Sequence, residues 1–97
     1  MKFQSATANE LARIPELAGV PGETLMRLAE RMERKQLSAG EGFDGEGRFG
    51  VVLTGMLRGE GGLLRPGETF STRVTAMTPA TVASCDRAVY EGMRERA

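Results

Sequence analysis

Turn-forming residues recur at short intervals through the middle of the chain, and their spacing limits the fold more than any other feature. Glycine reaches positive φ and proline fixes φ at the second position of a turn, so each site can reverse or bend the chain. Such spacing predicts an all-β roll or barrel of about seven or eight short strands rather than βαβ units. The sites are Ser38-Ala39-Gly40, Asp44-Gly45-Glu46-Gly47, Thr54-Gly55, Gly61-Gly62, Pro66-Gly67 and Thr78-Pro79.

Residues 49–58 contain two β-favouring runs that meet at Thr54-Gly55. We interpret them as the central hairpin of the roll, because glycine allows the tight reversal that a hairpin needs. Alternation places Val51 and Leu53 on one face of the first strand and Val52 and Thr54 on the other.

A set of apolar residues should join the helices to the roll and be largely buried: Leu28, Met32, Val51, Leu53, Leu57, Val74 and Val82. On this reading, truncating Leu53 to Ala costs about 2–5 kcal/mol of stability.

Helical signals flank the strand region. Thr7 and Glu10 form a capping-box pattern for a short helix that ends before Pro15. A second helix follows Pro21 and reaches Arg34, with apolar residues at i, i+3, i+4 and i+7. Those apolar residues are Leu25, Leu28, Ala29 and Met32, while Arg27, Arg31 and Arg34 lie on a face that reads as a solvated surface.

The C-terminal part predicts a third helix. Asp86 is a typical N-cap residue, and Arg87 to Arg96 would form the helix. The sequence thus predicts one domain over 1–97, with N-terminal helices in 7–34, a β-roll in 35–85 and a closing helix in 86–96. A chain of 97 residues supports one modest core.

Composition excludes several classes of function. Thirteen basic and thirteen acidic residues balance, which argues against nucleic-acid and membrane partners. The absence of His removes the commonest metal ligand and general base, so we expect no metal, no cofactor and no enzymatic activity. A single Cys85, with no signal peptide and no membrane-spanning run, predicts a soluble cytoplasmic protein.

The order of helix, helix, short strands and helix resembles the cyclic nucleotide-binding domain. That domain is a jelly-roll type β-roll with flanking helices, found in catabolite-activator-type regulators and in protein kinase A regulatory subunits. The resemblance implies a mainly β fold with flanking helices over roughly Leu11 to Met93. The similar segments are Ile14–Val20, Ala39–Glu41, Val51–Gly55, Leu64–Phe70, Val74–Thr78 and Cys85–Arg87.

The chain departs from that family at the phosphate-binding cassette. In the family, a Gly-Glu pair, a short helical turn and an Arg hold the cyclic phosphate. Here only three residues separate Phe70 from the strand beginning at Val74, and Phe70 aligns with the family's Arg. A compressed cassette is the alternative, and its candidate ligand-binding residues are Gly67, Glu68, Phe70, Ser71, Thr72 and Arg73.

Several candidates have both a functional and a structural interpretation. Arg73 could contact an anion or, as we prefer, pair with Glu68 across the turn. Phe70 could stack on a base, but a core position is favoured. The Asp44-Gly45-Glu46-Gly47 loop lacks the ligand count of a calcium loop, which favours a plain turn. Cys85 has no His to activate it and reads as a buried structural thiol.

We therefore expect a non-catalytic cyclic nucleotide-binding-like module that has lost nucleotide binding and serves protein–protein interaction or assembly. The alternative is a small regulatory domain that binds a cyclic nucleotide or another small anion through the compressed cassette. Because the sequence ends at Ala97, the last helix has about three turns, and output would need a surface contact. The candidate contact is Val89, Tyr90 and Met93 with Arg94 and Arg96 as a polar rim, although the first three could instead only close the roll.

Overall fold

A computed structural model describes residues 8–96, with side chains up to residue 93, and the cap predicted at Thr7 lies outside them. Residues 8–11 are helical. The elements that follow are η1 (Pro15–Leu17), α2 (Gly22–Arg31), β1 (Glu33–Leu37), β2 (Gly42–Phe43), β3 (Arg48–Thr54), β4 (Leu57–Gly59), β5 (Gly62–Leu64), β6 (Thr69–Phe70), β7 (Val74–Ala76), β8 (Ala80–Asp86) and α3 (Arg87–Arg96). The predicted turn sites lie between strands or, for Thr54 and Gly62, at a strand end.

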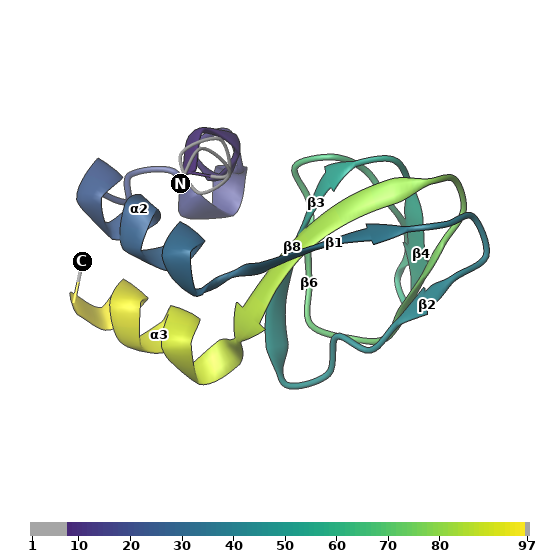
Figure 1. Cartoon of the computed structure of the whole chain (residues 1–97). Coiled ribbons are helices and arrows are strands. Elements are labelled where there is room, and N and C mark those ends of the chain that lie inside the picture. The colour runs from purple at the N-terminus through teal and green to yellow at the C-terminus, as the bar shows by residue number, and fades with distance from the viewer. Residues whose placement is uncertain (1–7, 97) are drawn as a thin grey trace.

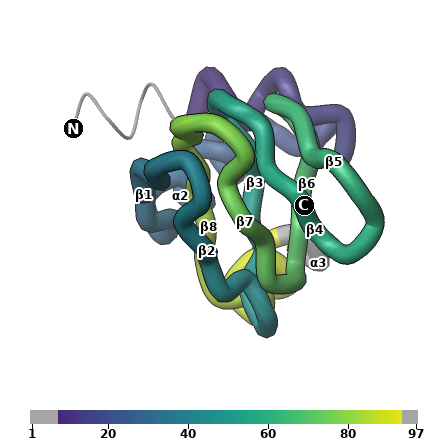
Figure 2. The backbone as a smooth tube through the Cα atoms, turned by 90° about the vertical axis from the view of Figure 1, so that its right-hand side faces the viewer, coloured from purple at the N-terminus to yellow at the C-terminus, as the bar shows by residue number. Residues whose placement is uncertain are grey.

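The strands form two antiparallel sheets that face each other as a roll. One sheet has the order β1-β8-β3-β6 and the other the order β2-β7-β4-β5. The helices gather at one end of this roll (Figure 1), and Figure 2 looks at the molecule from the opposite end, with the strands toward the viewer. The predicted combination of a mainly β roll and flanking helices is therefore confirmed.

The predicted central hairpin is wrong, because β3 and β4 belong to different sheets. Gly55, at φ +83°, turns the chain from one sheet into the other, and an added Cβ there would collide with the Pro79 carbonyl oxygen and Ala80. The neighbours of β3 are instead β8 and β6. Local β propensity identified both strands but carries no information on their partners.

The predicted alternation along β3 is confirmed for Val51, Val52 and Leu53, and both faces of the strand are covered there, but it does not continue to the exposed Thr54. Val51 and Leu53 pack against the cluster beneath the helices, whereas Val52 belongs to the cluster between the two sheets. The register with β8 shifts between Val52 and Thr54, so Leu53 lies at a bulge and is only half-buried.

Helix α2 ends at Arg31, three residues before the predicted end at Arg34. Met32 already has extended backbone, at φ −88° and ψ 142°, and the chain continues into β1, which pairs with β8. The sheet pairing thus overrides the helical pattern. Arg34 then reaches back to Glu10, with Nη1 and Oε1 3.2 Å apart.

Two hydrophobic clusters hold the molecule together. One lies between the helices and the β3–β8 side of the roll, and the other fills the space between the sheets. Five of the seven predicted core residues are buried, namely Leu28, Val51, Leu57, Val74 and Val82. Met32 and Leu53 are only partly buried, which corrects the prediction for these two.

Leu57 should therefore contribute more to stability than Leu53. Leu57 is fully buried between the sheets, and its truncation to Ala should lower the free energy of unfolding by about 2–5 kcal/mol. Leu53→Ala should cost clearly less, because part of that side chain is already in water. Chemical denaturation of the two variants beside the unmodified protein measures both losses. Equal losses of unfolding free energy would mean that Leu53 is as buried as Leu57, which would contradict its position at a bulge.

Candidate functional site

The six candidate cassette residues lie where the chain passes from one sheet to the other. Strand β6 pairs with β3 at the edge of the first sheet, with Phe70 opposite Gly50. Strand β7 lies inside the second sheet, between β2 and β4. Only residues 71–73 connect them, and none is helical.

Phe70 lies inside the roll, with 7% of its surface exposed. Its ring meets Phe43 edge-on, with centroids 6.0 Å apart. Glycine is required on two sides of the ring: a Cβ added at Gly50 would come within 2.5 Å of it, and one at Gly45 within 2.9 Å. The core interpretation of Phe70 is confirmed, and its ring occupies interior space beside β3.

The turn before β6 uses its polar groups within the chain. Gly67 has φ +95° and donates its N–H to the Val52 carbonyl at 2.9 Å. The Val52 N–H in turn donates to the Glu68 carbonyl at 2.9 Å. The Glu68 carboxylate accepts the Arg65 N–H at 2.6 Å. These contacts fasten the turn to β3 and to itself.

Arg73 is turned to solvent, with 75% of its side chain exposed. Its guanidinium lies 3.6 Å from an Asp44 carboxylate oxygen, so the predicted partner Glu68 is wrong. The other Asp44 oxygen accepts the Glu46 N–H at 3.1 Å, as in an Asx turn. Asp44 thus serves a turn and a surface ion pair. Among the side chains that the structure describes, which end at residue 93, no three of His, Cys, Asp or Glu come together as a metal-binding group.

Ser71 and Thr69 connect the candidate segment to the helices. The Ser71 hydroxyl accepts a hydrogen bond from Arg87, the first residue of α3. The Thr69 hydroxyl donates to Glu16 at 2.7 Å, and the Tyr90 hydroxyl donates to the other Glu16 oxygen at 3.4 Å. The sequence pattern gave no signal for these links, because each joins residues far apart in the chain.

Of the three candidate contact residues on α3, Tyr90 is 3% exposed and lies in the core beneath the helices. Its ring stacks on Phe49, with centroids 3.7 Å apart and planes at 2°. Val89 and Met93 are half-buried beside it. Only these two of the three present accessible apolar surface in this structure.

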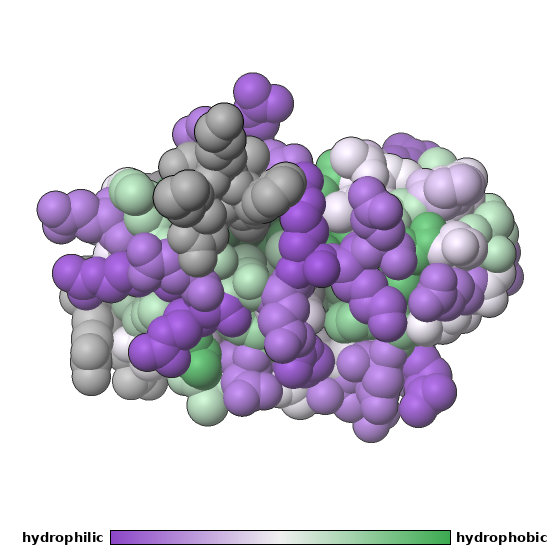
Figure 3. Space-filling model, viewed as in Figure 1, coloured by the Kyte–Doolittle hydropathy of each residue, from purple (hydrophilic) through white to green (hydrophobic). Residues whose placement is uncertain are grey.

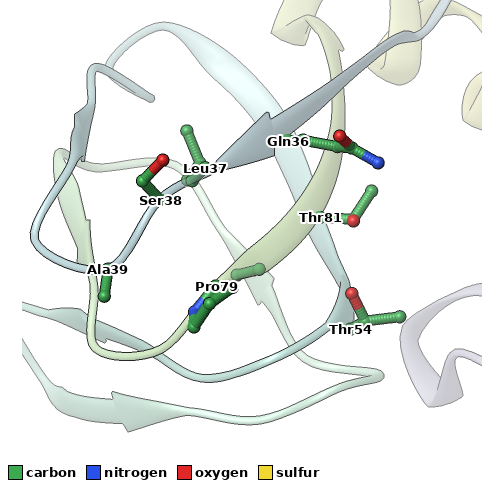
Figure 4. Close-up of a pocket in the computed structure, with 8 residues that line it drawn as sticks. Gln36, Leu37, Ser38, Ala39, Thr54, Pro79 and Thr81 are labelled. Atoms are coloured by element: carbon green, nitrogen blue, oxygen red, sulfur yellow. The ribbon is translucent and has the colours of Figure 1, made fainter.

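An open hollow of about 510 Å³ lies away from the candidate cassette, at the end of β1 and the start of β8 (Figure 4). Gln36, Thr54 and Thr81 line it, together with Leu37, Ser38, Ala39, Pro79 and Ala80. No charged side chain is among them. A second hollow, of about 390 Å³, brings Gly67 beside Arg13 and Leu53 on the outer side of the first sheet.

Cys85 is buried in β8. Burial raises the pKa of its thiol above the ordinary value, and this outweighs the nearby Arg48 cation, which acts in the opposite direction. A neutral, enclosed thiol is a poor nucleophile.

The native protein should therefore resist a disulfide reagent at pH 8 and react fully once denaturant unfolds it. Thr54→Cys provides a control, because residue 54 is exposed and should react at once. Rapid reaction of Cys85 in the folded protein would contradict its burial.

None of the helices within residues 8–96 has the length and apolar composition needed to cross a bilayer.

No protein-family model matches the chain, and no curated protein matches it in sequence. Solved structures do match. The regulatory domain of Toxoplasma gondii protein kinase A, in co-crystal with cAMP, has a TM-score of 0.81 at 16% identity, over 96% of this chain and 46% of that one. The regulatory subunit of a cAMP-independent protein kinase A from Trypanosoma cruzi, bound to guanosine, has a TM-score of 0.78 at 18% identity, over 97% and 42%.

A cyclic nucleotide-binding-like protein from Brucella abortus is closer in size, with a TM-score of 0.67 at 20% identity, over 93% of this chain and 98% of that one. By contrast, the chain spans less than half of the two kinase regulatory structures. At such identities the likeness concerns the fold. The chain has the β-roll fold of cyclic nucleotide-binding domains.

Proposed function

We propose that this chain is a non-catalytic cyclic nucleotide-binding-like module that does not hold a cyclic nucleotide and acts through contact with protein. The observation that carries the proposal is the Phe70 ring, which lies against Gly50 inside the roll. In the resemblance drawn from the sequence, this position belongs to the Arg that binds the cyclic phosphate. An apolar ring there supplies no charge and takes up space.

The groups that remain near the cassette position are poorly suited to a phosphate. Phosphate sites in proteins combine free backbone N–H groups with a guanidinium that reaches the anion. Here the Gly67 N–H donates to Val52, and the Arg65 N–H donates to the Glu68 carboxylate. Arg73 is mostly in solvent beside Asp44. Binding an anion would require breaking several of these contacts.

Known structures of this fold support a role without cAMP. One of the similar structures is a cAMP-independent kinase regulatory subunit, bound to guanosine. The fold thus occurs in a regulatory protein that does not depend on cAMP. Separately, a lone buried cysteine, Cys85, suits the cytoplasmic location expected from the sequence.

The alternative function is anion binding through the compressed cassette, and one observation favours it. The ion pair between Arg73 and Asp44 is long, at 3.6 Å, and both side chains are exposed. Such pairs contribute about 0–1 kcal/mol, so an anion could displace Asp44 at little cost.

Calorimetric titration with cyclic AMP and cyclic GMP tests the proposal. Loss of two or three charge-assisted hydrogen bonds, each worth roughly 1.5–3 kcal/mol, turns a micromolar site into one of about millimolar affinity or weaker. We expect no saturable heat at micromolar ligand.

Saturable micromolar binding would overturn the proposal. If Arg73→Ala then abolished binding while Arg58→Ala, a control at another exposed arginine, left it intact, the compressed cassette would be the function.

A further inference from the structure

We infer that the groove between α2 and α3 is a docking site for an acidic amphipathic helix of a protein partner. The inference rests on the proposed function, since it names the surface and the partner chemistry of that protein contact. The two helices lie side by side at the end of the molecule away from the roll (Figure 1).

The groove has an apolar floor. A hollow of about 210 Å³ is lined by Arg31 of α2 and by Ala88, Val89, Gly92 and Met93 of α3. Val89 and Met93 are one turn apart and half-buried, so they form a short apolar ridge along α3. Figure 3 shows hydrophobic surface among the hydrophilic side chains at this end of the molecule.

Gly92 is the position on α3 where the backbone of a partner helix could come closest. It lies in the middle of α3, is exposed, and does not have the positive φ that would demand glycine. A Cβ added there would meet nothing within 4 Å, so the packing of the chain itself does not require a glycine either. Glycine destabilises a helix interior relative to alanine. Together with Ala88 one turn earlier, it leaves room for a partner backbone.

The charge at the rim selects an acidic partner. Arg31 lines the groove, and Arg27 lies one turn before it on α2. Neither forms an ion pair with any side chain that the structure describes, and both are exposed. Glu30 is separated from Arg31 by about 100° round the helix axis and is not among the residues that line the hollow. On α3, Glu91 is already paired with Arg87 at 3.0 Å.

A helix fits this groove better than an extended segment. A strand would need free backbone groups of a sheet edge, whereas the groove walls are helices whose backbone groups bond internally. A third helix can instead place its side-chain ridges between α2 and α3. Leu or Met side chains would contact Val89 and Met93, and flanking carboxylates would meet Arg27 and Arg31.

Two synthetic helical peptides test the inference with the whole chain. One carries Leu at i, i+3, i+4 and i+7 with Glu on both flanks, and the other has Lys in place of every Glu. Fluorescence anisotropy should show the acidic peptide binding at least about tenfold more tightly. Amide resonances of α2 and α3 should shift in the NMR spectrum. Absence of binding, equal binding of both peptides, or shifts confined to the roll would overturn the inference.

Variants of the chain locate the contact. Arg31→Glu should weaken acidic-peptide binding about tenfold, whereas Arg58→Glu, the same charge change on β4, should leave it unchanged. Gly92→Ala should raise the thermal midpoint and yet weaken binding, a combination that a purely structural glycine would not produce. Equal effects of Arg31→Glu and Arg58→Glu, or unchanged binding in Gly92→Ala, would contradict the groove.

Cyclic AMP titrated into the same samples by calorimetry keeps the two ideas separate. Micromolar nucleotide binding would overturn the proposed function even if the peptide bound. Failure of the acidic peptide without nucleotide binding would overturn only the groove.

Discussion

The contact between the Phe70 ring and Gly50 is the constraint on which the inside of this roll depends. Phe70 lies opposite Gly50 where β6 pairs with β3, and any side chain at residue 50 would displace the ring. The ring also meets Phe43 from the neighbouring sheet, so it joins the two layers. A roll that packs a phenylalanine at this point has a hydrophobic interior there. Our functional proposal is built on that packing.

The same segment also joins the roll to its helices. Glu16 accepts hydrogen bonds from Thr69 of β6 and from Tyr90 of α3, and Ser71 accepts one from Arg87. The short connection between β6 and β7 therefore contacts the start of α3 directly. Tyr90 is further fixed by its stack on Phe49 of β3. These contacts hold α3 in one orientation, with Val89 and Met93 half-buried beside Tyr90 and partly accessible at the surface of the helix pair.

Much of the fold could be predicted because its signals are local. Glycine and proline turns gave the strand limits, and the Asp86 boundary gave the start of α3. Pairing between strands could not be predicted, because β3 finds its partners β8 and β6 far along the chain. The same limitation misplaced the end of α2, where pairing of β1 with β8 outweighs the helical pattern.

The candidate site, too, has features that the sequence predicted and features that it did not. Phe70 was predicted to be a core residue at the start of a strand; its burial is confirmed, although it ends β6. The prediction that Arg73 pairs with Glu68 was wrong. Its partner, Asp44, is distant in sequence, and only the fold brings it near. For Tyr90 the sequence left two roles open, contact surface or closure of the roll, and the structure places its side chain in the core.

Proton NMR of the unliganded protein tests the central claim most directly. If the Phe70 ring lies on Gly50, nuclear Overhauser effects should join its ring protons to the Gly50 α-protons and to the Phe43 ring, and the Gly50 α-protons should be shifted by the ring current. If these effects are absent and the Phe70 ring resonates like that of a solvent-exposed phenylalanine, the interior of the roll is open, and our proposal that the Phe70 ring excludes a nucleotide is wrong.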